Sequence, residues 1–300
     1  MAVTDILLPA DAAGALPVVR KITPDDLKDA LRKGLDDFWA MPTHILFLGL
    51  IYPVVGLIIG RAAFGYDVVP LLYPLAAGFA LLGPIGGIGL YELSRRREAG
   101  MDTSWKHGLD VFHSPSLPGI AAVGLLLLVL FGLWIGVAEA LYVTAFGYGE
   151  PPSLSAFFND MFGTPQGHWL IVVGNAAGFL FALLALMISV VSFPLLLDRN
   201  VGPAVAILTS VRAVIENPVT MALWGLIVAA LLAVGFATFF IGLAIVVPVL
   251  GHATWHLYRR VVAPIDAPHP LYNPVRKGIR FGADFPANLF SSYRADKPKP

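Results

Sequence analysis

The stretch that decides the fold runs from Asn217 to Tyr258 and reads NPVTMALWGLIVAALLAVGFATFFIGLAIVVPVLGHATWHLY. It contains no Asp, Glu, Lys or Arg over 42 residues. As a single helix it would reach about 63 Å at 1.5 Å per residue, roughly twice the thickness of a bilayer's hydrocarbon core. Backbone groups in lipid must form their hydrogen bonds within the helix. The stretch therefore predicts two membrane-spanning helices joined by a tight turn near residues 236–239.

The composition of the whole chain agrees with this interpretation. Of its 300 residues 57% are hydrophobic and 13% are charged, whereas soluble domains carry about 25% charged residues. The chain therefore belongs among polytopic membrane proteins. It contains no Cys, which excludes disulfides, thiolate-zinc sites, iron–sulfur clusters and a cysteine nucleophile. No apolar run of signal-peptide length occurs before Lys33, so we expect the first span to insert the chain.

An amphipathic helix is predicted ahead of the first span, after a loose tail over residues 1–22. Thr23 suits the N-cap and Pro24 suits the first helical position. Apolar residues then recur at helical spacing, which is typical of a helix lying on a membrane face, although a helix that simply covers the bundle is the alternative. The predicted apolar face consists of Leu27, Leu31, Leu35 and Phe38.

Apolar segments predict six spans, and the basic residues predict their direction. Four spans fall at about residues 44–60, 68–91, 118–143 and 168–197, and two fall within 217–258. Basic residues number 5 before the first span, 4 between the second and third, 2 between the fourth and fifth, and 8 after the sixth. Only Arg61 falls on the opposite side. The positive-inside rule therefore predicts a bacterial inner-membrane protein with both termini in the cytoplasm.

A recurring pattern predicts an internal repeat. Segments 34–42, 108–115 and 210–218 each end an amphipathic segment at Pro, and two spans follow each of them. Pro lacks an N–H and often begins a helix, so it marks the point where an in-plane helix turns into the bilayer. The alternative is that each connector acquired the same turn independently. We expect an all-α membrane domain over 23–262, built from three units of an interfacial helix plus a transmembrane hairpin, at 23–91, 94–197 and 201–258.

Three separated segments carry a family resemblance. They are residues 192–199 (SFPLLLDR), 211–218 (VRAVIENP) and 251–259 (GHATWHLYR). In this order they resemble the bacterial predicted integral membrane proteins catalogued as domain of unknown function 2189. The resemblance covers about Asp36 to Val262. It implies an inner-membrane location, and it brings neither an activity nor any functional residue with it.

Two histidines are the candidate metal or haem ligands. His252 and His256 stand four residues apart and share one helical face, a spacing that suits joint ligation. Ala253, however, occupies the place where a zinc-protease motif has its catalytic Glu. The alternative, which we favour, is that the two histidines are interfacial or hydrogen-bonded residues beside Trp255 and Tyr258, the aromatic belt at the cytoplasmic boundary. His44, at the start of the first span, is the one further histidine that could lie close to the pair. No other ligand is evident, so we expect no cofactor.

Ionisable groups within spans are pointers to a transport path, and there are few. Glu139 lies toward the external end of the third span and Asn175 lies inside the fourth, so these two form the candidate transport or polar site. A carboxylate close to the interface can also simply reach water. At the cytoplasmic edge we expect ion pairing among Asp198, Arg199, Arg212 and Glu216.

Glycine pairs and an aromatic tail indicate protein contacts. The pairs Gly83/Gly87, Gly132/Gly136 and Gly174/Gly178 have the spacing that lets membrane helices approach closely, as does a fourth pair within residues 56–60. The tail over 263–300 is rich in Pro, and its aromatic residues are unusual for a disordered segment. We expect it to dock on the bundle or on a partner through Phe281, Phe285, Phe290 and Tyr293.

The leading hypothesis is a non-catalytic membrane protein that serves as an accessory, assembly or scaffold component. Its expected partners are membrane lipid and another protein, and no nucleic acid. One alternative is a small-solute or lipid transporter, and another is a haem- or metal-binding protein that uses His252 and His256. An enzyme is the least supported reading, because no nucleophile, base and orienting group converge in the sequence.

Overall fold

The computed structural model describes residues 16–41, 69–149, 151–238 and 240–264. The described residues are helical, apart from connectors and one isolated bridge between Val19 and Val262, which confirms the all-α prediction for this part of the chain. The predicted span at 44–60 and the aromatic tail lie outside it. The elements are α1 (Pro24–Ala40), η3 (Val69–Leu71), α3 (Leu72–Gly86), α4 (Ile88–Glu98), η4 (Trp105–His113), α5 (Leu117–Phe146), α6 (Leu154–Gly163), α7 (Pro165–Ser189), α8 (Ser192–Asp198), α9 (Pro203–Glu216), α10 (Pro218–Ala237) and α11 (Leu243–Val261).

Three segments of the described chain are long and apolar enough to cross a membrane. They are α5, the continuous run of α7 and α8 over Pro165–Asp198, and α10. A fourth is added if the bent η3–α3 segment counts as one span. α11 is not among them, since its second half carries two histidines and two arginines. The protein is thus an all-helical membrane protein with several apolar helices, while the number of six and the threefold repeat stay predictions.

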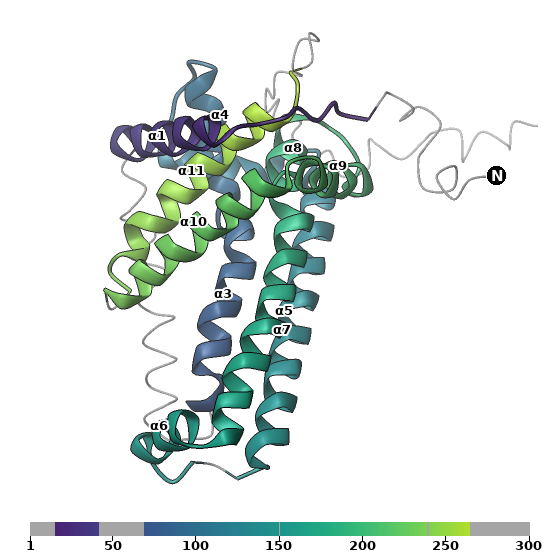
Figure 1. The fold of residues 1–300 in the computed structure, drawn as a ribbon. Coiled ribbons are helices and arrows are strands. Elements are labelled where there is room, and N and C mark those ends of the chain that lie inside the picture. The colour runs from purple at the N-terminus through teal and green to yellow at the C-terminus, as the bar shows by residue number, and fades with distance from the viewer. Residues whose placement is uncertain (1–15, 42–68, 150, 239, 265–300) are drawn as a thin grey trace, which may run out of the picture. The chain divides into compact units, whose positions relative to one another are not determined.

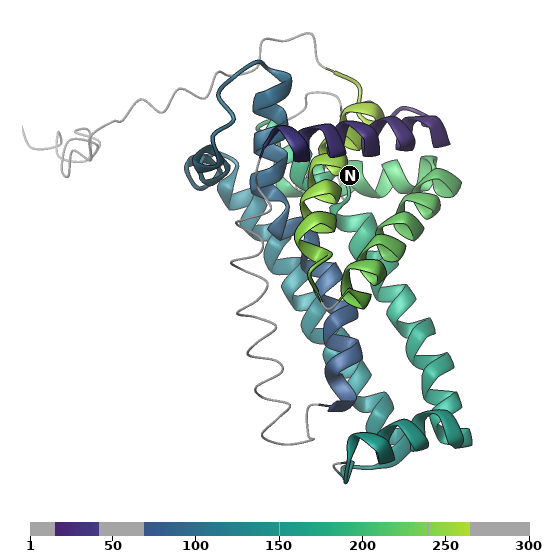
Figure 2. The same cartoon turned by 90° about the vertical axis from the view of Figure 1, so that its left-hand side faces the viewer.

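Helices α3, α5 and α7 run side by side (Figures 1 and 2). The Trp134 side chain of α5 contacts both other helices, at Gly78 of α3 and Gly178 of α7. A Cβ at Gly178 of α7 would stand only 3.1 Å from the Trp134 ring. The ring is buried, so its N–H needs an acceptor inside the protein. The indole nitrogen of Trp134 donates to the carbonyl of Pro74 on α3, at 2.8 Å. The pair Gly174/Gly178 therefore lies on a helix that packs within the bundle, as the close-approach spacing predicts.

Helix α1 lies across α11 (Figure 2), and the two backbones approach closely at Gly34. A Cβ at Gly34 would stand 2.6 Å from the backbone nitrogen of Ala253. Because α1 packs on α11 through the face that contains Ala30 and Gly34, Leu35 and Trp39 lie off this contact. Leu35 is 43% exposed and Trp39 is 76% exposed. Of the predicted apolar face, Leu27 and Phe38 are buried in the bundle, while Leu35 lies outside the contact with α11, which is made at Gly34. The start of α1 is as predicted: the backbone N–H of Thr23 donates to Asp26, as in a capping box.

The chain turns between the end of α10 at Ala237 and the start of α11 at Leu243. Its turn lies two residues beyond the predicted one, and Phe240 adopts a positive φ of 66° while its ring meets Phe236 edge to face. In Figures 1 and 2 this turn lies nearer to the level of α1 than α6 does. Measured from the end of the bundle where α1 lies, the α10–α11 hairpin therefore extends less far than α5 and α7. A hairpin returns the chain to the side that it left. The two ends of this hairpin therefore share a side whether or not the turn crosses the whole bilayer.

Residues 16–22 lie against the junction of α9 and α10 and against the end of α11. The backbone N–H of Arg20 donates to Val261 at 2.7 Å, and that of Ala263 donates to Val18 at 2.9 Å. Asn217, the N-cap of α10, is buried and accepts from the backbone N–H of Ile22 at 2.9 Å. Its amide nitrogen donates to the carbonyl of Arg20 at 3.1 Å. One side chain thus links the segment before α1 to the start of the last hairpin.

Candidate functional site

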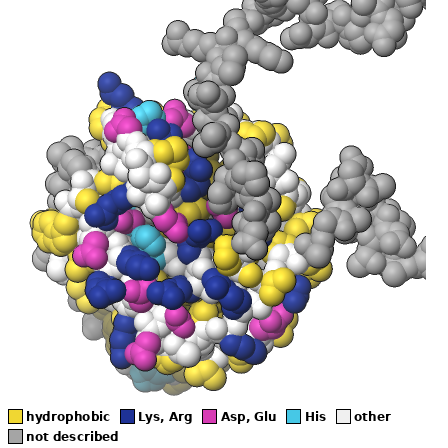
Figure 3. Space-filling view, turned by 90° about the horizontal axis from the view of Figure 1, so that it is seen from above, with side chains coloured by type: hydrophobic (Ala, Val, Ile, Leu, Met, Phe, Trp, Pro, Cys, Tyr) yellow, Lys and Arg dark blue, Asp and Glu magenta, His cyan; other side chains and the backbone are white. Residues whose placement is uncertain are grey.

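The described basic residues gather at one end of the bundle, which we call the basic end. Each described Lys or Arg lies on or next to α1, α4, η4, α8, α9 or α11, while α5, α6, α7 and α10 contain none. Figure 3 shows this end face-on, with acidic side chains interspersed among the basic ones. The sorting along the sequence is therefore also a sorting in space, as the positive-inside rule requires of a membrane protein.

A carboxylate of α1, Asp37, is the centre of a buried polar network at the basic end. Its side chain is 5% exposed and accepts three hydrogen bonds. Ser94 of α4 donates to Asp37 Oδ2 at 2.5 Å, and His256 Nε2 of α11 contacts the same oxygen at 2.8 Å. Arg97 of α4 donates to the other oxygen, Oδ1. Three helices that are far apart in the sequence thus meet on one carboxylate, which is the way a buried charge is tolerated.

These bonds also set the ionisation of Asp37. Burial raises the pKa of its carboxyl group, but the hydrogen bonds from His256, Ser94 and Arg97 outweigh burial, so the pKa lies below its ordinary value. The carboxylate form is therefore the one that the surrounding donors stabilise. At neutral pH Asp37 is an anion with its donors already in place, and it is not a proton donor.

His252, the second predicted histidine, extends the network into a fully buried position. Its Nδ1 lies 2.8 Å from Ser94 Oγ, and its side chain is inaccessible. Since the single hydroxyl proton of Ser94 goes to Asp37, the Nδ1 of His252 carries the proton for the bond to Ser94. The other ring nitrogen, Nε2, has no hydrogen-bond partner in the described part of the chain. His252 and His256 face the same side of α11, as predicted, but they contact different groups.

The network contains Ser, His and Asp without forming a catalytic triad. In a triad the imidazole lies between the serine and the carboxylate, where it can take the serine proton. Here Ser94 lies between Asp37 and His252, so its proton points to the carboxylate. Ser94 and His252 are also inaccessible. The Ser94 hydroxyl therefore joins α4 to α1 and α11.

A second polar network joins α4, α8 and α11. The hydroxyl of Tyr258 donates to Asp198 at 2.5 Å, and Arg259 lies 3.8 Å from the same carboxylate. Arg259 also donates to Glu98 at 3.1 Å, and the indole N–H of Trp255 donates to that carboxylate at 2.9 Å. Trp255 and Tyr258, which we predicted as part of an aromatic belt, are buried hydrogen-bond donors, and their place at a membrane boundary stays a prediction.

The predicted ion pairs at the cytoplasmic edge form as two separate pairs. Arg199 Nε lies 3.5 Å from Asp198 at the end of α8. Arg212 and Glu216 pair at 3.0 Å within α9. Asp198 thus forms an ion pair with its sequence neighbour Arg199 and accepts a hydrogen bond from Tyr258 of α11. Arg212 and Glu216 form an ion pair with each other.

The two predicted intramembrane polar residues differ in their surroundings. Asn175 of α7 accepts a hydrogen bond from the Tyr73 hydroxyl of α3 at 2.7 Å, beside a cavity of about 230 Å³. Glu139 is exposed on α5, and it makes no hydrogen bond or ion pair within the described residues. No bond joins Glu139 to Asn175 there. The structure therefore gives Asn175 a partner in the sequence-distant helix α3 and leaves Glu139 outside the bundle.

No three His, Cys, Asp or Glu side chains come together as a metal site within the described residues. His44, which the sequence suggests as a further neighbour of the histidine pair, lies outside them. Metal or haem binding by His252 and His256 therefore stays a prediction.

Sequence reasoning missed Asp37, Ser94 and Asn217 as structural polar groups. Asp37 is one turn after Gly34, on the face that packs against α11, so a carboxylate at this position of an apolar stripe was the available signal. Asn217 stands directly before the helix-starting Pro218, a place where an Asn side chain often makes capping bonds. Ser94 carries no local signal, since its partners are 57 and 158 positions away.

Similarity to known proteins covers the middle of the chain. Residues 72–198, from α3 to the end of α8, match the model of a family described as predicted integral membrane protein (DUF2189). The resemblance is confirmed over this segment. It includes the motif at 192–198, while the motifs at 211–218 and 251–259 lie beyond the matched residues. No curated protein and no solved structure matches the chain.

Proposed function

We propose that the protein is an accessory, assembly or scaffold component that acts by binding another membrane protein. The observation that carries this proposal is a ridge of small residues on α5, formed by Gly132, Gly136 and Ala140, which we call the α5 ridge. All three are exposed, and no described atom lies within 4 Å of a Cβ placed at either glycine. Only 33% of the most apolar window of α5 is buried.

The α5 ridge differs from the other predicted glycine pairs. Gly178 of α7 packs against the Trp134 ring, and Gly87, between α3 and α4, lies against the Tyr91 side chain. Small residues four apart allow two membrane helices to approach closely, and such contacts rest on van der Waals packing. Since this spacing is unused by the described chain at Gly132 and Gly136, it is available to a helix of another molecule.

The polar groups support a non-catalytic role. Asp37, Ser94, Asp198 and Glu98 all hold hydrogen bonds between helices, so the groups that could do chemistry are occupied by internal contacts. An accessory protein needs helices that are held firmly together and a surface that is free to bind a partner. These hydrogen bonds hold the helices together. The protein would therefore act by binding another membrane protein, without catalysing a reaction.

The test is site-directed photo-crosslinking in native membranes. A photoreactive amino acid at Leu133, which is 58% exposed beside the ridge, should give one discrete adduct with a membrane protein or a second copy. The matched control is Leu180 of α7, which is 59% exposed, and it should give none. Gly132→Ile with Gly136→Ile should abolish the Leu133 adduct, whereas Ala176→Ile on α7 should not. Equal adducts at both positions, or no adduct at Leu133, would refute the proposal.

The proposed topology is an inner membrane location with both termini in the cytoplasm and six passes, the first within residues 44–60. The gathering of the described Lys and Arg residues at the basic end supports it. Reporter fusions after residue 16 and after residue 264 should both be active on the cytoplasmic side. A periplasmic signal from either fusion would overturn this topology.

A transporter is the second candidate, and the Tyr73–Asn175 bond beside a cavity favours it, because polar groups inside the membrane often line a solute path. Flux in proteoliposomes that is lost in Glu139→Gln or Asn175→Leu would support this function. Wild-type liposomes without flux above protein-free liposomes would argue against it.

A further inference from the structure

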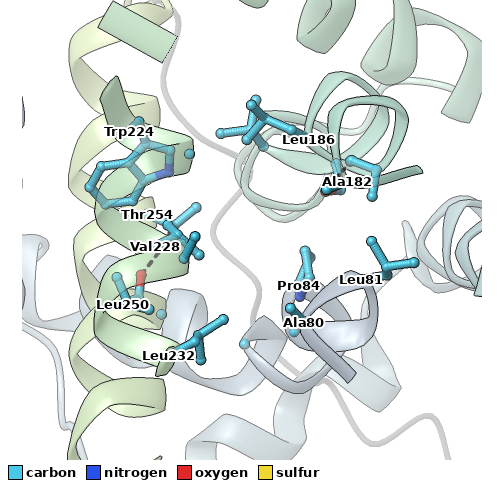
Figure 4. Close-up of a pocket in the computed structure, with 18 of the residues that line it drawn as sticks. Ala80, Leu81, Pro84, Ala182, Leu186, Trp224, Val228, Leu232, Leu250 and Thr254 are labelled. Atoms are coloured by element: carbon cyan, nitrogen blue, oxygen red, sulfur yellow. Dashed lines mark hydrogen bonds between the residues drawn. The ribbon is translucent and has the colours of Figure 1, made fainter. Parts of the chain in front are cut away.

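An apolar cavity of about 220 Å³ lies between α3 and α7 on one side and α10 and α11 on the other (Figure 4). It is larger than the apolar cavity of about 150 Å³ that accommodates benzene in another protein. Small residues open the space: Ala80 and Gly83 line it from α3, and Gly225 and Gly251 line it from the last hairpin. A Cβ at Gly83 would meet nothing within 4 Å.

Two hydrogen-bond donors that belong to buried residues of the cavity wall make no hydrogen bond within the described chain. Trp224 of α10 is 2% exposed and Tyr91 of α4 is 3% exposed, and both line the cavity. Neither the indole N–H nor the hydroxyl group donates a hydrogen bond within the described residues. In Figure 4 the indole nitrogen of Trp224 is on the cavity side of the ring. An unpaired buried donor costs about 1–3 kcal/mol, so a group that accepts from it is stabilised.

Other buried aromatic donors in the described chain do have acceptors. Trp134 donates to Pro74, Trp255 donates to Glu98 and Tyr258 donates to Asp198. Trp224 and Tyr91 therefore depart from a pattern that the rest of the bundle follows. What distinguishes these two residues is that both border the same cavity.

The depth of the two donors indicates which molecule they suit. Tyr91 is one turn before Arg95, the first arginine of α4, and Trp224 is six residues after Pro218, where α10 begins at the basic end. At 1.5 Å per residue the donors are about 6–9 Å along their helices from that end. The polar interface of a bilayer is of similar thickness, so this depth is the boundary of headgroups and hydrocarbon. The ester carbonyls of a phospholipid lie at this boundary.

We propose that this cavity binds a phospholipid from the leaflet at the basic end. An acyl chain fills the space beside Gly83, and the ester carbonyls accept hydrogen bonds from Trp224 and Tyr91. The cavity thereby holds a lipid between the α10–α11 hairpin and the pair α3–α7. This site is independent of the α5 ridge.

The experiment uses a phospholipid with a photoreactive diazirine in its acyl chain, in nanodiscs that contain the full chain. Labelled peptides are mapped by mass spectrometry. Wild-type protein should carry the label on α3, α10 and α11, and Gly83→Leu should lose it at least fivefold because the leucine fills the cavity. The matched control is Gly163→Leu, which adds the same side chain at the exposed end of α6, where a Cβ meets nothing within 4 Å, and it should keep the label. The Leu133 crosslink of the proposed function should persist in Gly83→Leu.

A conservative double variant tests the donors without changing the cavity volume much. Trp224→Phe with Tyr91→Phe removes both donors and should weaken lipid retention about tenfold, if each bond contributes about 0.5–1 kcal/mol net. Unchanged labelling in Gly83→Leu and in this double variant would overturn the proposal. Displacement of the lipid by a photoreactive isoprenoid quinone, another apolar molecule with carbonyl acceptors, would also overturn it and assign the cavity to the quinone.

Discussion

Asp37 and His256 are separated by 219 positions in the sequence, and their Oδ2 and Nε2 atoms lie 2.8 Å apart. The contact joins the first described helix to the last one. Because Ser94 and Arg97 of α4 bind the same carboxylate, Asp37 holds three helices together at the basic end.

Asp37→Asn should destabilise the protein by about 3 kcal/mol, because it leaves buried donors opposite an amide in place of a carboxylate. The measurement is the free energy or midpoint of unfolding in mild detergent. Asp36→Asn is the matched control, since Asp36 is exposed one position away. Equal stabilities of the two variants would contradict the assigned role of Asp37.

Gly34→Ala should destabilise the packing of α1 on α11. The added methyl group would stand 2.6 Å from the backbone nitrogen of Ala253, so one helix has to move, at a cost of about 1–3 kcal/mol. Gly86→Ala is the control, because a Cβ there meets nothing within 4 Å. Thermal unfolding of both variants checks this, and a Gly34→Ala protein as stable as wild type would show that the two helices pack less closely.

Asn217→Ala should release the segment before α1. It removes bonds to the backbone of Ile22, Arg20 and Ala213, together about 2–3 kcal/mol if each contributes about 1. Trypsin should then cleave after Arg20 and Lys21 faster than in wild type. The exposed Asn200, changed to Ala, serves as the control and should leave the cleavage rate unchanged. Slow cleavage in Asn217→Ala would count against the link.

The contacts of His107 should make η4 sensitive to pH. Hydrogen bonds from the ring to Asp110 and Asp102 raise the pKa of His107 above its ordinary 6.5, against the opposing effects of burial and of Arg96. The stabilisation from the protonated ring is therefore complete below pH 6.5 and is lost as the pH rises through the raised value. NMR titration of the ring should show this pKa, and Asp110→Asn should lower it. A His107 pKa of 6.5 or below in the wild type would refute the prediction.

Several elements could be predicted from the sequence because their signals are local. The run Thr23 to Asp26 contains its own capping box, and the start of α5 next to Pro118 follows from the apolar run after it. The hairpin turn was placed two residues early, because Phe240 takes a positive φ that its residue type disfavours.

The hydrogen-bond partners within the polar networks could not be predicted from local sequence signals. The shared face of His252 and His256 follows from their spacing, but their partners depend on which helices meet. The exposed position of Leu35 has the same origin, since the close approach of α1 to α11 at Gly34 overrides a stripe of large apolar residues. Contacts of this kind are decided by packing between distant segments.

The joining of α1 to α11 also fixes an order of events during synthesis. Asp37 leaves the ribosome 219 residues before His256, a delay on the order of 10–45 s at translation rates of about 5–20 residues per second. Throughout this interval the carboxylate has to stay hydrated, or be shielded by a chaperone, because the histidine that completes its surroundings does not yet exist. The first described helix is therefore among the last to dock, and a ribosome that stalls before α11 releases a protein with α1 undocked.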